Sequence, residues 1–268
     1  MDLLFIILVF VFGAIIGSFL NVVVLRFNTG ASIGGRSKCM TCNNILKWYE
    51  LIPIFSFLIQ GGVCKKCKSR ISRQYPLVES FTGLLFVLIV LEFYPYTSIE
   101  VVMLVLQLII AGLLVVISVY DIKHKIIPNI FVYTFASLSF LSLFIGSGFS
   151  LFVVPSVIGL LAGPLLALPF ALIWLVSKGT WMGLGDAKLL LGIGWLLGLA
   201  DSLNSVILSF WVAAVISVSW LLLKYHSIKA RTEIPFGPYL IIGMYIVLLF
   251  HLEVIDFKVT YEILTSFF

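Results

Sequence analysis

Long apolar stretches recur along the whole chain, and most of them are close to the length that crosses a bilayer. Eight follow one another, at 3–25, 77–94, 98–119, 128–146, 151–176, 187–199, 204–223 and 238–255. A helix rises about 1.5 Å per residue, so roughly 20 apolar residues cross a hydrocarbon core of about 30 Å. A soluble chain carries about a quarter charged residues, whereas this one has 11%. The pattern predicts an all-α polytopic membrane protein with about eight transmembrane helices.

The basic residues indicate how these helices are oriented. Nine of the 17 lie in the polar segment that follows the first stretch, and seven more fall in 120–127, 177–188 and 224–237. Because cytoplasmic loops are rich in Lys and Arg, we expect these segments to be cytoplasmic, with only Lys258 outside. Asp2 and the absence of a basic start argue against a cleaved signal peptide. The placement of the charge beside a spanning helix predicts contact with membrane lipid and none with nucleic acid.

Four cysteines form two CxxC pairs in the polar insert. The pairs are Cys39/Cys42 and Cys64/Cys67, with 21 residues between them. Four thiolates at this spacing favour a tetrahedral Zn²⁺ site, and such a closed site is structural and not catalytic. Two disulfides or free thiols are the alternative, which the reducing cytoplasm disfavours. The sequence thus divides into a first helix (1–25), a zinc module (26–76) and a seven-helix membrane domain (77–268).

Two aspartates mark a candidate catalytic site. Asp121 ends the third apolar stretch, and Asp186 begins the sixth within Gly183-Leu184-Gly185-Asp186. The charge pattern puts both at the same membrane face, where an ionisable group is costly and usually functional. Two carboxyl groups within reach share one proton, so that one acts as base toward water while the other polarises a peptide carbonyl. Gly183 and Gly185 would let the backbone approach the substrate closely.

The same residues are also compatible with functions other than a peptidase. Each aspartate could be a helix-end residue with solvated neighbours, and a proton-coupled transporter would use the pair as a relay. A non-catalytic zinc-containing adaptor would need only the insert. The sequence contains no HExxH or Walker pattern. The residues alone therefore favour the peptidase without excluding the transporter or the adaptor.

Several motifs resemble those of the bacterial type IV prepilin leader peptidases, over nearly the whole chain. They are Gly17-Ser18-Phe19-Leu20-Asn21, the CxxC pairs with Trp48-Tyr49-Glu50, Ile71 to Pro76, Asp121 to Asn129, Gly183 to Lys188, and Ile234-Pro235-Phe236-Gly237-Pro238. The resemblance implies a GxGD aspartyl protease of the bacterial cytoplasmic membrane that removes basic leaders from prepilins or pseudopilins. Many members also methylate the new N-terminus with S-adenosylmethionine, so a methyltransferase activity is expected as well.

The resemblance also assigns roles to individual residues. It implies that Asp121 and Asp186 are catalytic and that the four cysteines hold structural zinc. Glu79 matches an acidic position of the family, and Gln74 departs from it by separating Arg73 from Tyr75. A basic leader needs acidic contacts, for which the remaining inner carboxylates are candidates: Glu50, Glu79 and Glu233.

Overall fold

The computed structural model describes residues 2–30, 32, 34–95, 97–145, 152–223 and 235–256, and over these ranges it is helical without β-strands. The long helices are α1 (Leu3–Arg26), α3 (Gln74–Glu92), α4 (Ser98–His124), α5 (Asn129–Ser142), α6 (Val157–Ser177), α7 (Leu184–Leu197), α8 (Leu199–Leu223) and α9 (Gly237–Phe250). The polar insert holds the 3₁₀ turn η1 (Trp48–Glu50) and the short helix α2 (Phe55–Ile59). Each apolar stretch predicted from the sequence coincides with one long helix, so the all-α prediction is confirmed.

The helices differ in how well their lengths match a bilayer. Five are long and apolar enough to cross it: α1, α3, α4, α6 and the Leu199–Ser219 part of α8. The other three, α5, α7 and α9, have 14 residues each, which corresponds to about 21 Å. The chain is therefore a multi-pass membrane protein, while the number of eight complete spans stays a prediction.

Observed helix boundaries differ from the predicted ones at two places, and local sequence explains both differences. Helix α3 begins at Gln74, three residues before the predicted stretch, because Pro76 lies in the first turn, where its missing N–H is not needed. Helices α7 and α8 are separated by Gly198 alone, whose φ is 80°. A single glycine in this left-handed region ends one helix and starts the next.

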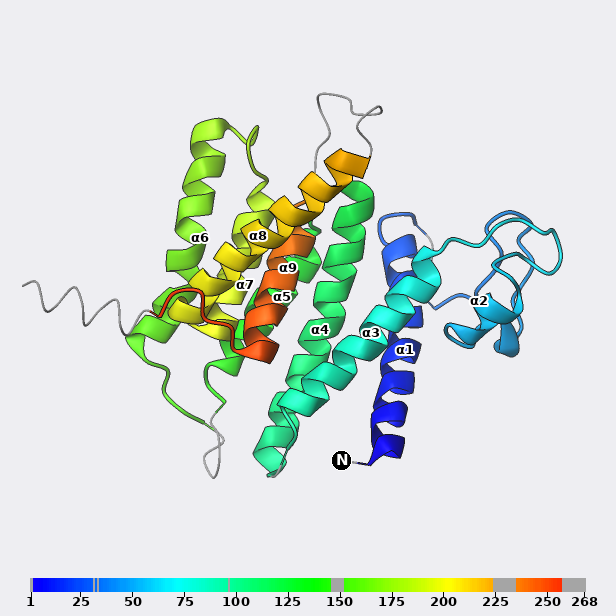
Figure 1. Cartoon of the computed structure of the whole chain (residues 1–268), viewed down its shortest axis with the longest axis horizontal. Helices are drawn as coiled ribbons and strands as arrows, with labels where there is room; N and C mark the ends of the chain where they lie inside the picture. The colour runs from blue at the N-terminus through cyan, green and yellow to red at the C-terminus, as the bar shows by residue number, and fades with distance from the viewer. Residues whose placement is uncertain are drawn as a thin grey trace, which may run out of the picture.

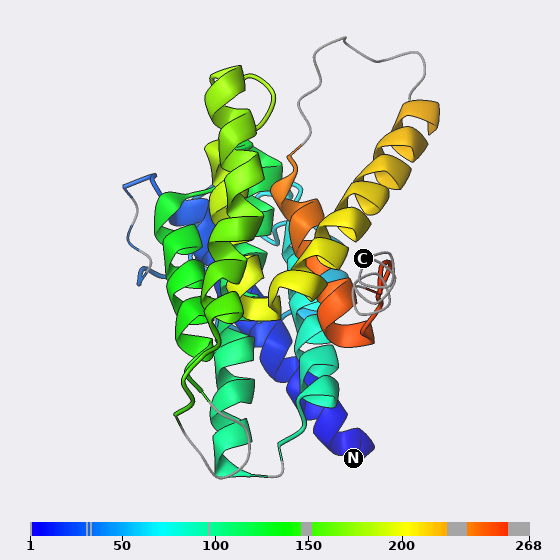
Figure 2. The same ribbon diagram turned by 90° about the vertical axis from the view of Figure 1, so that its left-hand side faces the viewer.

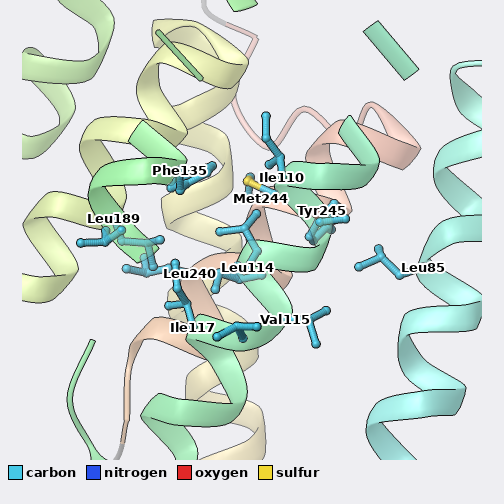
Figure 3. Packing of buried hydrophobic residues seen from close by; sticks show 14 of the residues in the cluster. Leu85, Ile110, Leu114, Val115, Ile117, Phe135, Leu189, Leu240, Met244 and Tyr245 are labelled. Carbon is cyan, nitrogen blue, oxygen red and sulfur yellow. The ribbon is translucent and has the colours of Figure 1, made fainter. Parts of the chain in front are cut away.

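Helix α4 stands between two groups of helices. Figure 1 shows α1, α3 and the insert on one side of it and α5 to α9 on the other, and Figure 2 gives the same arrangement from the side. Ile110, Leu114 and Ile117 of α4 are fully buried and form the centre of the apolar core. Figure 3 shows them packed against Phe135, Leu189, Leu240 and Met244.

Helix α7 packs against α6 at backbone distance. A Cβ atom on Gly194 would lie 2.6 Å from the Ala162 carbonyl oxygen, and one on Gly163 would lie 2.7 Å from that of Leu191. Such small-residue contacts are typical of helix packing in membranes, where van der Waals contact replaces the hydrophobic drive. This contact fixes the helix that carries Asp186.

Candidate functional site

Asp121 and Asp186 meet at one end of the helical core. Asp121 lies in the last turn of α4 and Asp186 in the first turn of α7. Asp121 is only 4% exposed and Asp186 only 8%. The two carboxyl groups lie close enough for the charge of Asp121 to act on Asp186. The structure therefore brings together, from two helices, the two aspartates that the sequence paired.

The start of α9 forms one wall beside Asp121. The backbone N–H of Gly237 donates a hydrogen bond to Asp121 Oδ2 at 3.2 Å. A Cβ atom on Gly237 would stand 2.8 Å from the same oxygen, so a glycine is required for this approach. This contact spans 116 residues, and sequence reasoning gave Gly237 no role. The Gly237-Pro238 pair at the start of an apolar stretch was the available signal.

Gly183 and Gly185 border Asp186 in different ways. Gly183 precedes α7, and its backbone forms a hydrogen bond with the Asp186 carboxyl group. A Cβ atom on Gly185 would lie 2.9 Å from Cβ of Ile127, in the loop after α4. Cδ1 of Ile127 would also lie 3.1 Å from a Cβ atom on Gly237. Gly185 thus serves packing against Ile127, whereas Gly183 lies next to the carboxyl group.

Lys188 connects α7 to α5 near the two aspartates. Its Nζ donates to Asn129 Oδ1 at 2.8 Å and lies 5.0 Å from the centre of the Tyr133 ring. Asn129 is the first residue of α5, directly after the loop that holds Ile127. Lys188 therefore fixes the loop between α4 and α5 and leaves the aspartates free of a cationic partner on α7.

The four cysteines of the insert converge on one point. Their sulfur atoms all lie within 4.8 Å of one another, and the Sγ atoms of Cys39 and Cys67 are 3.8 Å apart. Zinc–sulfur bonds of about 2.3 Å in a tetrahedron separate the sulfurs by about 3.8 Å. No disulfide joins them. The cluster can hold a metal ion, as the CxxC spacing predicted.

The two CxxC pairs lie in matching turns, 25 residues apart. The N–H of Cys39 donates to the Asn44 carbonyl and that of Cys64 to the Ser69 carbonyl, both at 2.9 Å. Asn43 and Lys68 both adopt positive φ, at 55° and 58°. Backbone N–H groups of Cys42 and Thr41 lower the pKa of the Cys39 thiol to about 6. Paired turns with an accessible thiolate are the geometry of a zinc knuckle.

Glu79 lies apart from the aspartates and has its own partners. It is 5% exposed on α3, where its Oε2 accepts a hydrogen bond from the backbone N–H of Ile54 at 2.7 Å. Its carboxyl group also bonds to the side chain of Ser18 on α1. Glu79 thus joins α1, α3 and the insert, and does not cap its own helix.

Two further polar residues extend this contact. Asn21 of α1 donates to the Tyr75 carbonyl at 3.4 Å and accepts from Gln74 Nε2 at 3.2 Å. Gln74, the departure from the family pattern, is therefore part of the contact between α1 and α3. Sequence reasoning assigned neither Asn21 nor Gln74 a structural role.

Glu50 and Glu233 are the remaining acidic candidates. Glu50 Oε2 accepts a hydrogen bond from the backbone N–H of Lys47 at 2.9 Å, which caps η1. Glu233 lies outside the described residues. The structure thus does not gather Glu50 beside the aspartates.

Comparison with known proteins gives two consistent matches. The model of the bacterial peptidase A24 N-terminal domain matches residues 11–93, and that of the type IV leader peptidase family matches residues 108–218. The first range holds most of α1, the insert and α3, and the second holds both aspartates. No solved structure matches the chain significantly.

Relatives of known name match over nearly the full length. A prepilin leader peptidase/N-methyltransferase of Bacillus subtilis is 32% identical over 94% of this chain and 97% of its own. Those of Pseudomonas aeruginosa and Aeromonas salmonicida are 33% and 32% identical, over about nine tenths of both chains. The buried aspartate pair, the four-cysteine insert and these matches lead to one conclusion: the chain belongs to the type IV leader peptidase family.

Proposed function

We propose that this protein is an aspartic endopeptidase that removes the basic leader from type IV prepilins or pseudopilins at the cytoplasmic face of the membrane. The observation that carries the proposal is the buried pair of Asp121 and Asp186, contributed by two helices that meet at one end of the core. Two carboxyl groups without a cationic partner on α7 suit water-dependent peptide cleavage. The names of the full-length relatives support the substrate class.

In the proposed mechanism the two aspartates share one proton. The ionised carboxylate takes a proton from water, whose oxygen attacks the scissile carbonyl carbon, while the protonated carboxyl group donates to the carbonyl oxygen. Collapse of the tetrahedral intermediate breaks the C–N bond, and the leaving amine takes up a proton from the pair. The Gly237 N–H, 3.2 Å from Asp121 Oδ2, would hold that carboxyl group in place.

The four cysteines are proposed to hold a structural Zn²⁺ ion. Their sulfur spacing fits the tetrahedral geometry, and a closed four-thiolate shell leaves no position for water. The ion would supply folding energy to an insert with a small apolar core. In this proposal the module and the aspartates face the cytoplasm, as the positive-inside pattern favours.

A second activity, N-methylation of the new N-terminus, is favoured by the names of the relatives. S-adenosylmethionine would supply the methyl group, which passes from its sulfonium to the amine as the amine loses a proton. Glu79 and Asn21 already have partners within the chain, so the described contacts assign no residue to the methyl donor.

One experiment tests the peptidase against the adaptor and the transporter. The protein is reconstituted with a prepilin peptide, and cleavage is compared for the native chain, Asp121→Asn and Asp186→Asn. Loss of cleavage with unchanged helix content and thermal unfolding supports the peptidase. Full cleavage by either variant, or none by the native chain, overturns it.

Contact of the leader with acidic residues is a separate proposal. Glu50→Gln, Glu79→Gln and Glu233→Gln are compared on leaders of different charge. Because opposite charges across an interface mainly set specificity, the variants are expected to lose the preference for basic leaders. An unchanged preference in all three variants rejects these residues as leader contacts.

A further inference from the structure

The insert presents an apolar face that no part of the described chain covers. On the five-residue helix α2, Phe55, Leu58 and Ile59 are exposed, and Ile59 reaches 79%. These positions are spaced i, i+3, i+4 and share one side of the helix. Phe57 faces the other way and packs on Gly62 beside the second cysteine turn. The outward position of the apolar side is therefore set by packing of the opposite side.

Aromatic residues of η1 enlarge this face. Trp48 is 77% exposed and stacks edge-on with Tyr49, their ring centres 5.8 Å apart. Leu51 and Ile52 continue the exposed apolar surface toward α2. Trp and Tyr beside aliphatic side chains are typical of surfaces that sit at the level of lipid headgroups.

The charge of the insert complements an anionic surface. Between Arg26 and Arg73 there are nine basic residues, and Glu50 is the one acidic residue. Lys65 lies with its Nζ 4.7 Å above the Tyr49 ring, so cationic and aromatic groups occur together. Basic residues near an anionic leaflet attract the segment that carries them to the membrane surface.

A strained turn holds α2 in its orientation. Ile54 has φ 63° and ψ −55°, and the N–H of Phe55 donates to the Pro53 carbonyl at 2.6 Å, which forms a γ-turn with positive φ. This conformation is unfavourable for a β-branched residue and persists only where surrounding contacts impose it. The imposing contact is the hydrogen bond from Ile54 N–H to the buried carboxyl group of Glu79. Helix α2 is thus anchored to a membrane helix.

The position of the insert brings this face to the bilayer. Figure 1 shows α2 alongside the upper half of α1 and α3 and not beyond their ends. Helix α1 exposes Phe12, Ile15 and Phe19 along its length, and a spanning helix presents such side chains to lipid. The insert thus lies at the level of helices that cross the membrane.

We infer that the η1–α2 face (Trp48, Tyr49, Leu51, Ile52, Phe55, Leu58 and Ile59) docks into the headgroup region of the anionic leaflet in which α1 and α3 are embedded. The apolar side chains enter the boundary between headgroups and acyl chains, and the surrounding lysines contact lipid phosphates. The four-cysteine cluster is then held at the membrane surface.

The test uses the full-length protein in nanodiscs of phosphatidylcholine, with and without phosphatidylglycerol. Hydrogen exchange of the amides at 54–60 is measured in the native chain, in a Phe55→Ser/Leu58→Ser/Ile59→Ser variant, and in Met40→Ser. Met40 is a matched control, because it is an exposed apolar residue of the insert outside the η1–α2 face. Acyl chains brominated near the headgroup quench nearby tryptophan, and the contribution of Trp48 is the difference between the native chain and Trp48→Phe.

We expect phosphatidylglycerol to slow exchange at 54–60 at least fivefold in the native chain and in Met40→Ser, and not in the triple variant. Trp48 fluorescence is expected to be quenched by the brominated lipid. Unquenched Trp48 together with exchange that is independent of phosphatidylglycerol overturns the inference. Protection that arises only when an apolar prepilin peptide is added also overturns it, because the face would then bind substrate and not lipid.

Discussion

Buried carboxyl groups occupy two sites toward the same end of the helices, Glu79 in one and Asp121 with Asp186 in the other. The two sites differ in what surrounds the carboxyl groups. The carboxyl group of Glu79 has a backbone N–H from Ile54 and the hydroxyl of Ser18 as partners. Asp121 and Asp186 instead lie close enough for their charges to interact, each with a single backbone partner, Gly237 or Gly183. Because the partners of Glu79 come from two other elements, α1 and the insert, this carboxyl group holds structure in place. A carboxyl group with one backbone partner and a second carboxyl group nearby retains capacity for water and substrate, so mutations can separate the two sites.

The largest effect is expected from the aspartates themselves. Asp121→Asn and Asp186→Asn each keep the side-chain volume but remove the shared proton, so cleavage of a prepilin peptide should fall by about 10²–10⁴-fold. Single-turnover cleavage in detergent or nanodiscs measures it. Asp201→Asn is the control, because Asp201 lies in the first turn of α8 and should leave the rate unchanged. Equal losses in all three variants would contradict a site-specific role.

The next largest effect is expected at Gly237. In Gly237→Ala the new methyl group would lie 2.8 Å from Asp121 Oδ2 and 3.1 Å from Ile127 Cδ1, so the carboxyl group must move. Displacement of a catalytic group by about 1 Å costs about 100-fold in rate. Gly112→Ala in α4 is the matched control, because its Cβ atom would meet only Leu20, at an ordinary 3.8 Å. A rate loss in Gly112→Ala equal to that in Gly237→Ala would remove the argument from geometry.

The comparison also shows what the sequence could and could not predict. The eight long helices and the convergence of Asp121 with Asp186 were predictable, because they depend on the lengths of apolar stretches and the positions of basic residues. Both can be read from short stretches of the sequence. The partners of each carboxyl group were not. Gly237 is 116 residues from Asp121, and Ile54 is 25 residues from Glu79. Such contacts depend on how the helices pack, and no local pattern encodes that packing.

A smaller effect on cleavage is expected at Glu79. Glu79→Ala leaves the Ile54 N–H without its acceptor, and an unsatisfied buried donor costs about 1–3 kcal/mol. Exchange at the 54–60 amides should therefore speed up, while cleavage falls by less than in either aspartate variant. Glu79→Gln keeps an acceptor oxygen and should restore much of the protection. Loss of cleavage in Glu79→Gln as large as in Asp186→Asn would place Glu79 in the catalytic chemistry and end the distinction between the two groups.

The smallest effect on cleavage is expected from removal of the metal. The Cys39→Ser/Cys64→Ser variant keeps two of four ligands, so metal content measured by mass spectrometry should fall from about one ion per chain to near zero. The insert should then lose its protection from hydrogen exchange, because the proposed ion would join the two cysteine turns. Asp121 lies on α4 and Asp186 on α7, and α7 and the insert lie on opposite sides of α4 (Figure 1), so cleavage of a short prepilin peptide should change by less than in Glu79→Ala. Unchanged metal content would refute the four-cysteine site. A loss of cleavage equal to that of the aspartate variants would show that the insert controls the aspartate pair, and the two sides of α4 would have to be treated as one catalytic unit.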